Sequence, residues 1–169
     1  VHTDSSAGTD HLVTAIAEQN DGKILLGGHF STGRGSAHAW LARVQGSDGQ
    51  IDGNFNTSVN SQVLAIAVRA DGRILIGGNF TSVGGQTRNG LAELGGINAN
   101  LVDAWNPNAN SIVYSIALDA DEKVLVSGFF TSIGGVTRNR IARLDGTGAL
   151  DSFNPNANDS VYALAVQTD

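Results

Sequence analysis

The sequence predicts an all-β protein made of antiparallel four-stranded blades of a β-propeller, with about three and a half repeats of roughly 50 residues. One observation is the repeat itself, because similar segments begin at Val13, Val63 and Val113 and the same pattern starts again at Val161. A second is the composition, since 22 Gly and 15 Asn among 169 residues are typical of many tight turns. A third is that helical periodicity is found nowhere along the chain.

Each unit is predicted to contain three clear strands and a weaker fourth. In the second unit the expected runs are 63–68, 73–80, 90–94 and 101–105, with a polar loop at 81–90. Asp71-Gly72 joins the first two runs and predicts a β-hairpin with a tight primed turn, as Asp21-Gly22 does in the first unit. The third unit has Glu122 in place of the glycine, so we expect a less favourable turn there.

The first strand of each unit is apolar on both faces, as the run VLAIAV at 63–68 shows. A strand of this kind is buried on both sides, which is the situation of a sheet stacked between two others. The glycine pairs at 27–28 and 77–78 agree with stacking, because a strand without side chains leaves room for a neighbouring blade. A parallel β-helix has a shorter period and a jelly roll does not repeat, so both are less favoured.

We divide the chain into the tail of a preceding repeat (1–12), three repeats (13–62, 63–112 and 113–160) and the first strand of a further repeat (161–169). Closed propellers have four or more blades, so the ring is expected to be incomplete in a single chain. Three explanations stay open: a segment of a longer propeller, two chains paired into one ring, or chains stacked into a polymer. The start at Val1 and the stop within a unit favour a fragment or an assembling protomer over a self-sufficient monomer.

Composition excludes several classes of function. The absence of cysteine excludes disulfide scaffolds, thiol catalysis and thiolate metal sites. The net charge of −6 argues against a nucleic-acid partner. Apolar runs are far too short for membrane insertion. No nucleophile elbow or phosphate-binding loop is present, so we expect no enzymatic activity.

The recurring patterns DGKILLGGHF, DGRILIGGNF, TRNGLAEL and TRNRIARLDGTGALDSFNPNANDSVYALAV resemble the delta-sixty repeat, a β-propeller-like family of bacterial and archaeal proteins. The resemblance extends from about Asp10 to the end of the chain. It implies a secreted or cell-surface location and a scaffold or interaction role, and it brings no shared catalytic motif. The degenerate DADEKV and the segment His38-Ala39-Trp40, where other units read Arg-Asn, depart from the pattern.

Arg88 and Arg138 occupy the same place in two units, just before the third strand. A ring of arginines at one rim would bind acidic or sugar ligands. The favoured alternative is structural, namely an ion pair or a guanidinium that clamps backbone carbonyls, because a position that recurs in every module usually serves the module.

Trp40 has no aromatic counterpart in the other units and is a candidate for stacking on a sugar, with His38 beside it. Tyr114 and Tyr162 are expected to be buried between blades. The histidines, including His29, offer no complete set of metal ligands, so two solvated imidazoles are the favoured interpretation.

Calcium is the one cofactor that the sequence leaves open. Asp119, Asp121 and Glu122 cluster in a turn, and the Asn-Pro-Asn-Ala-Asn segments at 106–110 and 154–158 are rich in oxygen atoms. No EF-hand spacing is present, and the favoured alternative is that asparagine side chains bond to backbone amides in turns between blades.

The leading functional hypothesis is an extracellular structural or interaction module of a surface protein, adhesin or filament, with self-assembly through open blade ends. Its expected partners are other copies of the chain or the remainder of a longer propeller. The alternative is a carbohydrate-binding propeller with a glycan partner. A fragment of an enzyme with a site in the central channel ranks third.

Overall fold

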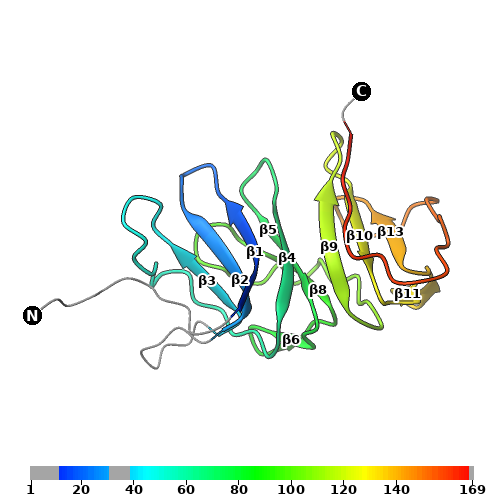
Figure 1. Cartoon of the computed structure of the whole chain (residues 1–169), viewed down its shortest axis with the longest axis horizontal. Helices are drawn as coiled ribbons and strands as arrows, with labels where there is room; N and C mark the ends of the chain where they lie inside the picture. Colours follow the sequence, from blue (N-terminus) through cyan, green and yellow to red (C-terminus); the bar gives the residue numbers. More distant parts are fainter. Residues whose placement is uncertain (1–11, 31–38, 168–169) are drawn as a thin grey trace, which may run out of the picture.

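The computed structural model describes residues 12–30 and 39–167, and every regular element in these residues is a β-strand. Three antiparallel sheets of three strands follow one another along the chain (Figure 1). Blade 1 is made of β1 (Leu12–Glu18), β2 (Ile24–His29) and β3 (Leu41–Val44). Blade 2 is made of β4 (Val63–Val68), β5 (Ile74–Gly78) and β8 (Leu91–Leu94). Blade 3 is made of β9 (Val113–Leu118), β10 (Val124–Gly128) and β13 (Ile141–Leu144).

In blades 2 and 3 the loop between the second and third long strands, expected to be a polar loop, contains a small hairpin. In blade 2 it pairs β6 (Ser82–Val83) with β7 (Gln86–Thr87), and in blade 3 it pairs β11 (Ser132–Ile133) with β12 (Val136–Thr137). Two consecutive glycines with positive φ, Gly84 and Gly85 in blade 2, close its turn. The pair was not predicted because the segment is polar and each of its strands is only two residues long.

The expected fourth strand is reduced to a single antiparallel bridge in each blade, so the prediction of four-stranded blades is wrong in this detail. The bridges join Val44 to Ile51, Leu94 to Leu101 and Leu144 to Leu150. The chain turns away at once, because Phe55 N–H donates to the carbonyl of Asp52 in a tight turn. This turn leaves no length for a longer ladder.

The expected strand at 161–169 is not present as a strand in its described part, 161–167. This segment runs beside β9 (Figure 1). It makes isolated contacts there, such as the hydrogen bond from Leu164 N–H to the Ser115 hydroxyl at 3.2 Å. Without a ladder to a second strand, an extended segment is not a β-strand.

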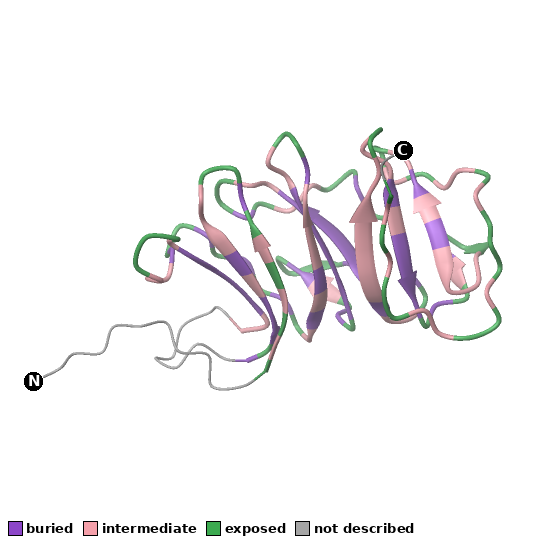
Figure 2. Ribbon diagram, turned by 45° about the horizontal axis from the view of Figure 1, so that its top comes forward, coloured by how far each residue is buried: buried purple, intermediate pink, exposed green. Residues whose placement is uncertain are grey.

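Neighbouring blades pack face to face, with β1, β4 and β9 at corresponding positions (Figure 1). Figure 2 shows that the buried residues lie mainly on the strands and that exposed residues are concentrated in the turns. One apolar cluster joins blades 1 and 2 around Leu25, Val63 and Ile76, and another joins blades 2 and 3 around Leu75 and Val113. The all-β architecture of stacked antiparallel sheets is therefore confirmed.

The first glycine of each pair has the role that the sequence predicts. A Cβ at Gly27 would lie 2.8 Å from Val63 Cγ1 in blade 2, and a Cβ at Gly77 would lie 2.9 Å from Val113 Cγ1 in blade 3. The second glycine has a different role. A Cβ at Gly78 would overlap the carbonyl oxygen of Gln62, the residue before β4 of the same blade, next to the point where the β4–β5 register shifts.

Candidate functional site

Arg88 and Arg138 form carbonyl clamps of the same design. Arg88 is 4% exposed, and its guanidinium donates to the carbonyl oxygens of Thr87 at 2.8 Å and Asp103 at 3.1 Å. Arg138 donates to the corresponding carbonyls of Thr137 and Asp151, both at 2.9 Å. Each arginine thus ties the loop before the third strand to the outer edge of its blade, which is the arrangement that the structural alternative predicts.

Trp40 stacks on His29, with ring centroids 4.9 Å apart and planes 7° from parallel. It is half-buried against the apolar cluster between blades 1 and 2 and has a positive φ of 70°. Its neighbour His38 lies outside the described residues. Much of the Trp40 ring is therefore in contact with other residues of the protein. This leaves less of the ring free to stack on a sugar than the sequence suggests, where Trp40 is the only aromatic residue at its position among the units.

The two tyrosines do not both lie buried between blades, so that expectation is wrong. Tyr162 is 69% exposed, and its ring packs on that of Tyr114 at a centroid distance of 4.8 Å. The segment at 161–167 lies at the outer side of blade 3, where none of the described residues covers the tyrosine ring completely.

Asp119, Asp121 and Glu122 do not form a group of metal ligands, and the described residues contain no cluster of three or more such side chains. Asp119 Oδ1 instead accepts hydrogen bonds from the N–H groups of Asp121 at 3.0 Å and Lys123 at 2.9 Å, which builds the turn. The Glu122 carboxylate faces the guanidinium of Arg69 in blade 2, with 3.7 Å between Oε2 and the nearer nitrogen. The carboxylates of Asp119 and Glu122 therefore face different partners.

The asparagine-rich segment at 106–110 follows the structural alternative in detail. Asn110 Oδ1 accepts hydrogen bonds from the N–H groups of Thr131 at 2.9 Å and Ser132 at 3.0 Å. Its side-chain amide donates to the Thr131 hydroxyl at 2.9 Å. Asn60 makes the same three bonds to Thr81 and Ser82 in the preceding blade. These asparagines connect each blade to the next.

A buried ionic network between blades was missed by sequence reasoning. Arg43 is 1% exposed, binds Asp52 through two nitrogens at 2.9 and 3.1 Å, and donates to the carbonyls of Gly96 and Ile97 in blade 2. Burial raises the pKa of Asp52, but the Asn54 N–H and the Arg43 guanidinium outweigh it and hold this pKa below its ordinary value.

Blade 2 has the reversed charge at the corresponding position. Glu93 is fully buried and accepts hydrogen bonds from Arg69 at 2.6 Å and from Arg73 at 2.9 Å. Arg69 also donates to the carbonyl of Glu122 in blade 3 at 3.0 Å. A comparison of units would have revealed the network, because positions 43, 93 and 143 are Arg, Glu and Arg while 19, 69 and 119 are Gln, Arg and Asp.

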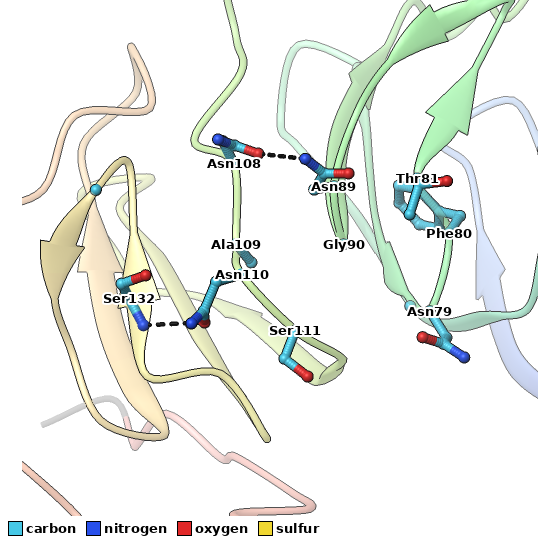
Figure 3. A pocket seen from close by; sticks show the side chains of 12 residues that line it. Asn79, Phe80, Thr81, Asn89, Gly90, Asn108, Ala109, Asn110, Ser111 and Ser132 are labelled. Carbon is cyan, nitrogen blue, oxygen red and sulfur yellow. Dashed lines mark hydrogen bonds between the residues drawn. The ribbon is translucent and has the colours of Figure 1, made fainter.

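A polar cleft of about 510 Å³ lies between blade 2 and the segment that leads into blade 3. Figure 3 shows Asn79, Phe80 and Thr81 on one side and the segment 108–111 on the other. None of its lining residues is charged. The Asn89 side-chain amide donates to Asn108 Oδ1 at 2.6 Å across one end of the cleft.

The cleft exists because blade 2 has small residues where the other blades have large ones. Corresponding backbone hydrogen bonds place Gly90 opposite Asn79, as they place Trp40 opposite His29 in blade 1. In blade 3 the same pair is Arg140 and Phe129, with the guanidinium 4.6 Å from the ring centroid. Blades 1 and 3 therefore fill this position with a stacked pair, and blade 2 leaves it open.

The three antiparallel sheets pack on one another through equivalent contacts, as the blades of a propeller-type repeat protein do. The chain matches the model of the family described as domain of unknown function (DUF5122) beta-propeller over residues 19–55, 69–95 and 120–153. It belongs to this family, and each matched segment lies within one of the three units. No match was found among curated proteins. In the residues that the structure describes, no helix has the length and apolar character needed to cross a membrane.

Proposed function

We propose that the chain is a non-enzymatic structural or interaction module whose outer blade faces bind a further blade, supplied by a second copy of the chain. The observation that carries this proposal is the repetition of one interface between blades 1 and 2 and between blades 2 and 3. We further propose that the module is of the delta-sixty repeat type, and that it acts at the cell surface or outside the cell, as that resemblance implies.

Among the described residues, the first exposed blade face belongs to blade 1. Ile66 and Ile116 are the residues whose Cδ1 atoms would lie 3.1 Å from a Cβ at Gly27 and Gly77 of the preceding blade. Ile16 is the corresponding residue of blade 1 and is 67% exposed. An isoleucine with this exposure on a strand is costly in water, and burying its exposed part against another blade would contribute about 1–2 kcal/mol.

The second partly exposed face belongs to blade 3, where the segment 161–167 lies beside β9 and Ser127, at the position of Gly27 and Gly77, is buried. Leu25 and Leu75 are completely buried by the following blade, whereas Leu125 at the same position is only half-buried. Likewise Phe55 is 1% exposed, whereas Phe153 is half-buried. Because Leu125 and Phe153 repeat residues that receive a following blade inside the chain, we infer that the exposed part of this face is complementary to blade 1 of a second copy.

Sedimentation velocity over a range of concentrations tests the proposal. The parent chain is expected to associate, and Ile16→Glu is expected to remain monomeric because it places a charge in the interface. Ile97→Glu is the matched control, since Ile97 is 84% exposed in a turn and should associate like the parent. A parent chain that is monomeric at every concentration, or an Ile16→Glu variant that associates normally, would refute the proposed contact.

A carbohydrate-binding role is the second candidate function. It is favoured by the uncharged polar lining of the cleft between blades 2 and 3 and does not depend on Trp40. Calorimetric titration with neutral oligosaccharides tests this role separately from self-association.

A further inference from the structure

We propose that the cleft between blade 2 and the 106–111 segment is a binding site for a neutral oligosaccharide. This assignment is independent of the proposed self-association, because the cleft lies between internal blades and not on an open face. It also differs from the rim positions that the sequence suggests, since Arg88, Arg138 and Trp40 are not among its lining residues.

The size of the cleft suits a small ligand. Its volume of about 510 Å³ lies inside the range of about 300–1,000 Å³ that is usual for small-molecule sites. The volume results from two substitutions within the repeat, Asn79 for an aromatic ring and Gly90 for a long side chain. Blade 2 is thus opened at a position where blades 1 and 3 are closed by stacked pairs.

The chemistry of the lining selects an uncharged ligand with many hydroxyl groups. Amide and hydroxyl groups predominate among the polar side chains, and each of these groups is able both to donate and to accept hydrogen bonds, as a sugar hydroxyl does. A charged ligand would enter without an opposite charge in the lining and would lose its hydration without compensation. The Asn79 side chain is exposed and makes no hydrogen bond with the described residues, so its donor and acceptor are available.

The polar groups of the cleft are held in place before any ligand binds. Asn110 is fixed by three hydrogen bonds to Thr131 and Ser132, and Asn89 is fixed by its bond to Asn108 (Figure 3). Asn108 has a positive φ of 57°, and its carbonyl accepts from Gly134 N–H at 3.1 Å. Rigid groups lose little conformational entropy on binding, which favours affinity for a small ligand.

Isothermal titration calorimetry with maltotetraose, cellotetraose and chitotetraose tests the assignment, with tetragalacturonate as the anionic comparison. At least one neutral tetrasaccharide is expected to bind with a Kd of about 1 mM or tighter. Asn79→Phe gives blade 2 the residue that blade 3 has, and it is expected to weaken binding at least about tenfold by filling the cleft. Asn54→Phe makes the same change at an exposed turn in blade 1 and should bind like the parent.

Asn79→Asp provides a second variant that preserves shape, and it should also weaken binding because it removes the amide donor. Thermal melts of all three variants should match that of the parent, since residues 54 and 79 are both exposed. The assignment is overturned if no neutral tetrasaccharide binds, if only tetragalacturonate binds, or if Asn79→Phe and Asn79→Asp both retain full affinity.

Discussion

Replacing Gly77 by serine is expected to destabilise the protein by crowding the interface between blades 2 and 3. The new Cβ would lie 2.9 Å from Val113 Cγ1 and 3.1 Å from Ile116 Cδ1, whereas relaxed carbon contacts are about 3.5–4.0 Å. Over-packing of this kind costs about 1–3 kcal/mol. The serine hydroxyl would add a buried polar group and destabilise the protein further. In the opposite direction, replacing glycine reduces the conformational entropy of the unfolded chain, which stabilises the protein by about 0.4–1 kcal/mol.

The net expectation is a loss of about 2–3 kcal/mol in the free energy of unfolding. Urea unfolding followed by circular dichroism measures this value, and a thermal melt should show a decrease in Tm of roughly 4–12 °C. The chain supplies its own control, because Ser127 stands at the equivalent position of blade 3.

No complete blade follows Ser127 among the described residues, and its hydroxyl is buried without a partner in them. Ser127→Gly removes this unpartnered group but adds chain freedom, so it should change stability by less than about 1 kcal/mol. A Gly77→Ser variant as stable as the parent would show that the blades separate at little cost, and the reasoning from close packing would then be wrong.

Three further predictions concern the buried charges. Glu93→Ala should cost about 3–5 kcal/mol in urea unfolding, because it leaves Arg69 buried without its carboxylate. Asp52 has a folded-state pKa below the ordinary 3.8, so its contribution to stability is complete above about pH 3.8 and is lost as the pH falls through the lower folded value. Asp52→Asn should therefore reduce the slope of stability against pH in acid, measured by urea titrations between about pH 2 and 5. Arg88→Ala should cost about 2 kcal/mol in the same assay, since two charged hydrogen bonds to carbonyls are lost, and tetragalacturonate titration of the variant should match that of the parent.

Several local features were predictable because they depend on neighbours in the sequence. Glu122 has a φ of 60°, which confirms that the third hairpin makes its turn with a residue less suited to it than Gly22 and Gly72. Gly27 and Gly77 lie against the next blade as expected. The asparagines bond to backbone amides in the segments between blades.

Other features failed because short elements compete closely with turns. The fourth strand was expected from the apolar residues near Leu101, but a tight turn follows the bridge in blades 1 and 2 and stops the ladder. The hairpin of β6 and β7 is too short to show an alternating pattern in its sequence. Tyr162 was expected to be buried because, like Tyr114, it follows the first residue of a predicted first strand, yet it is 69% exposed.

The sequence by itself determined the all-β class, the unit of about 50 residues and the places where blades meet, since a repeated pattern of apolar strands and glycines follows from local chemistry. Only the tertiary structure decided which charges face each other and where a cavity opens. Each of the Arg43–Asp52 and Arg69–Glu93 pairs joins one residue of a strand to one residue outside the strands. The cleft beside Asn79 and Gly90 forms only where the segment 108–111 lies next to blade 2. Contacts between segments far apart in the sequence depend on how the sheets stack, and the local sequence of one segment does not determine which other segment it contacts.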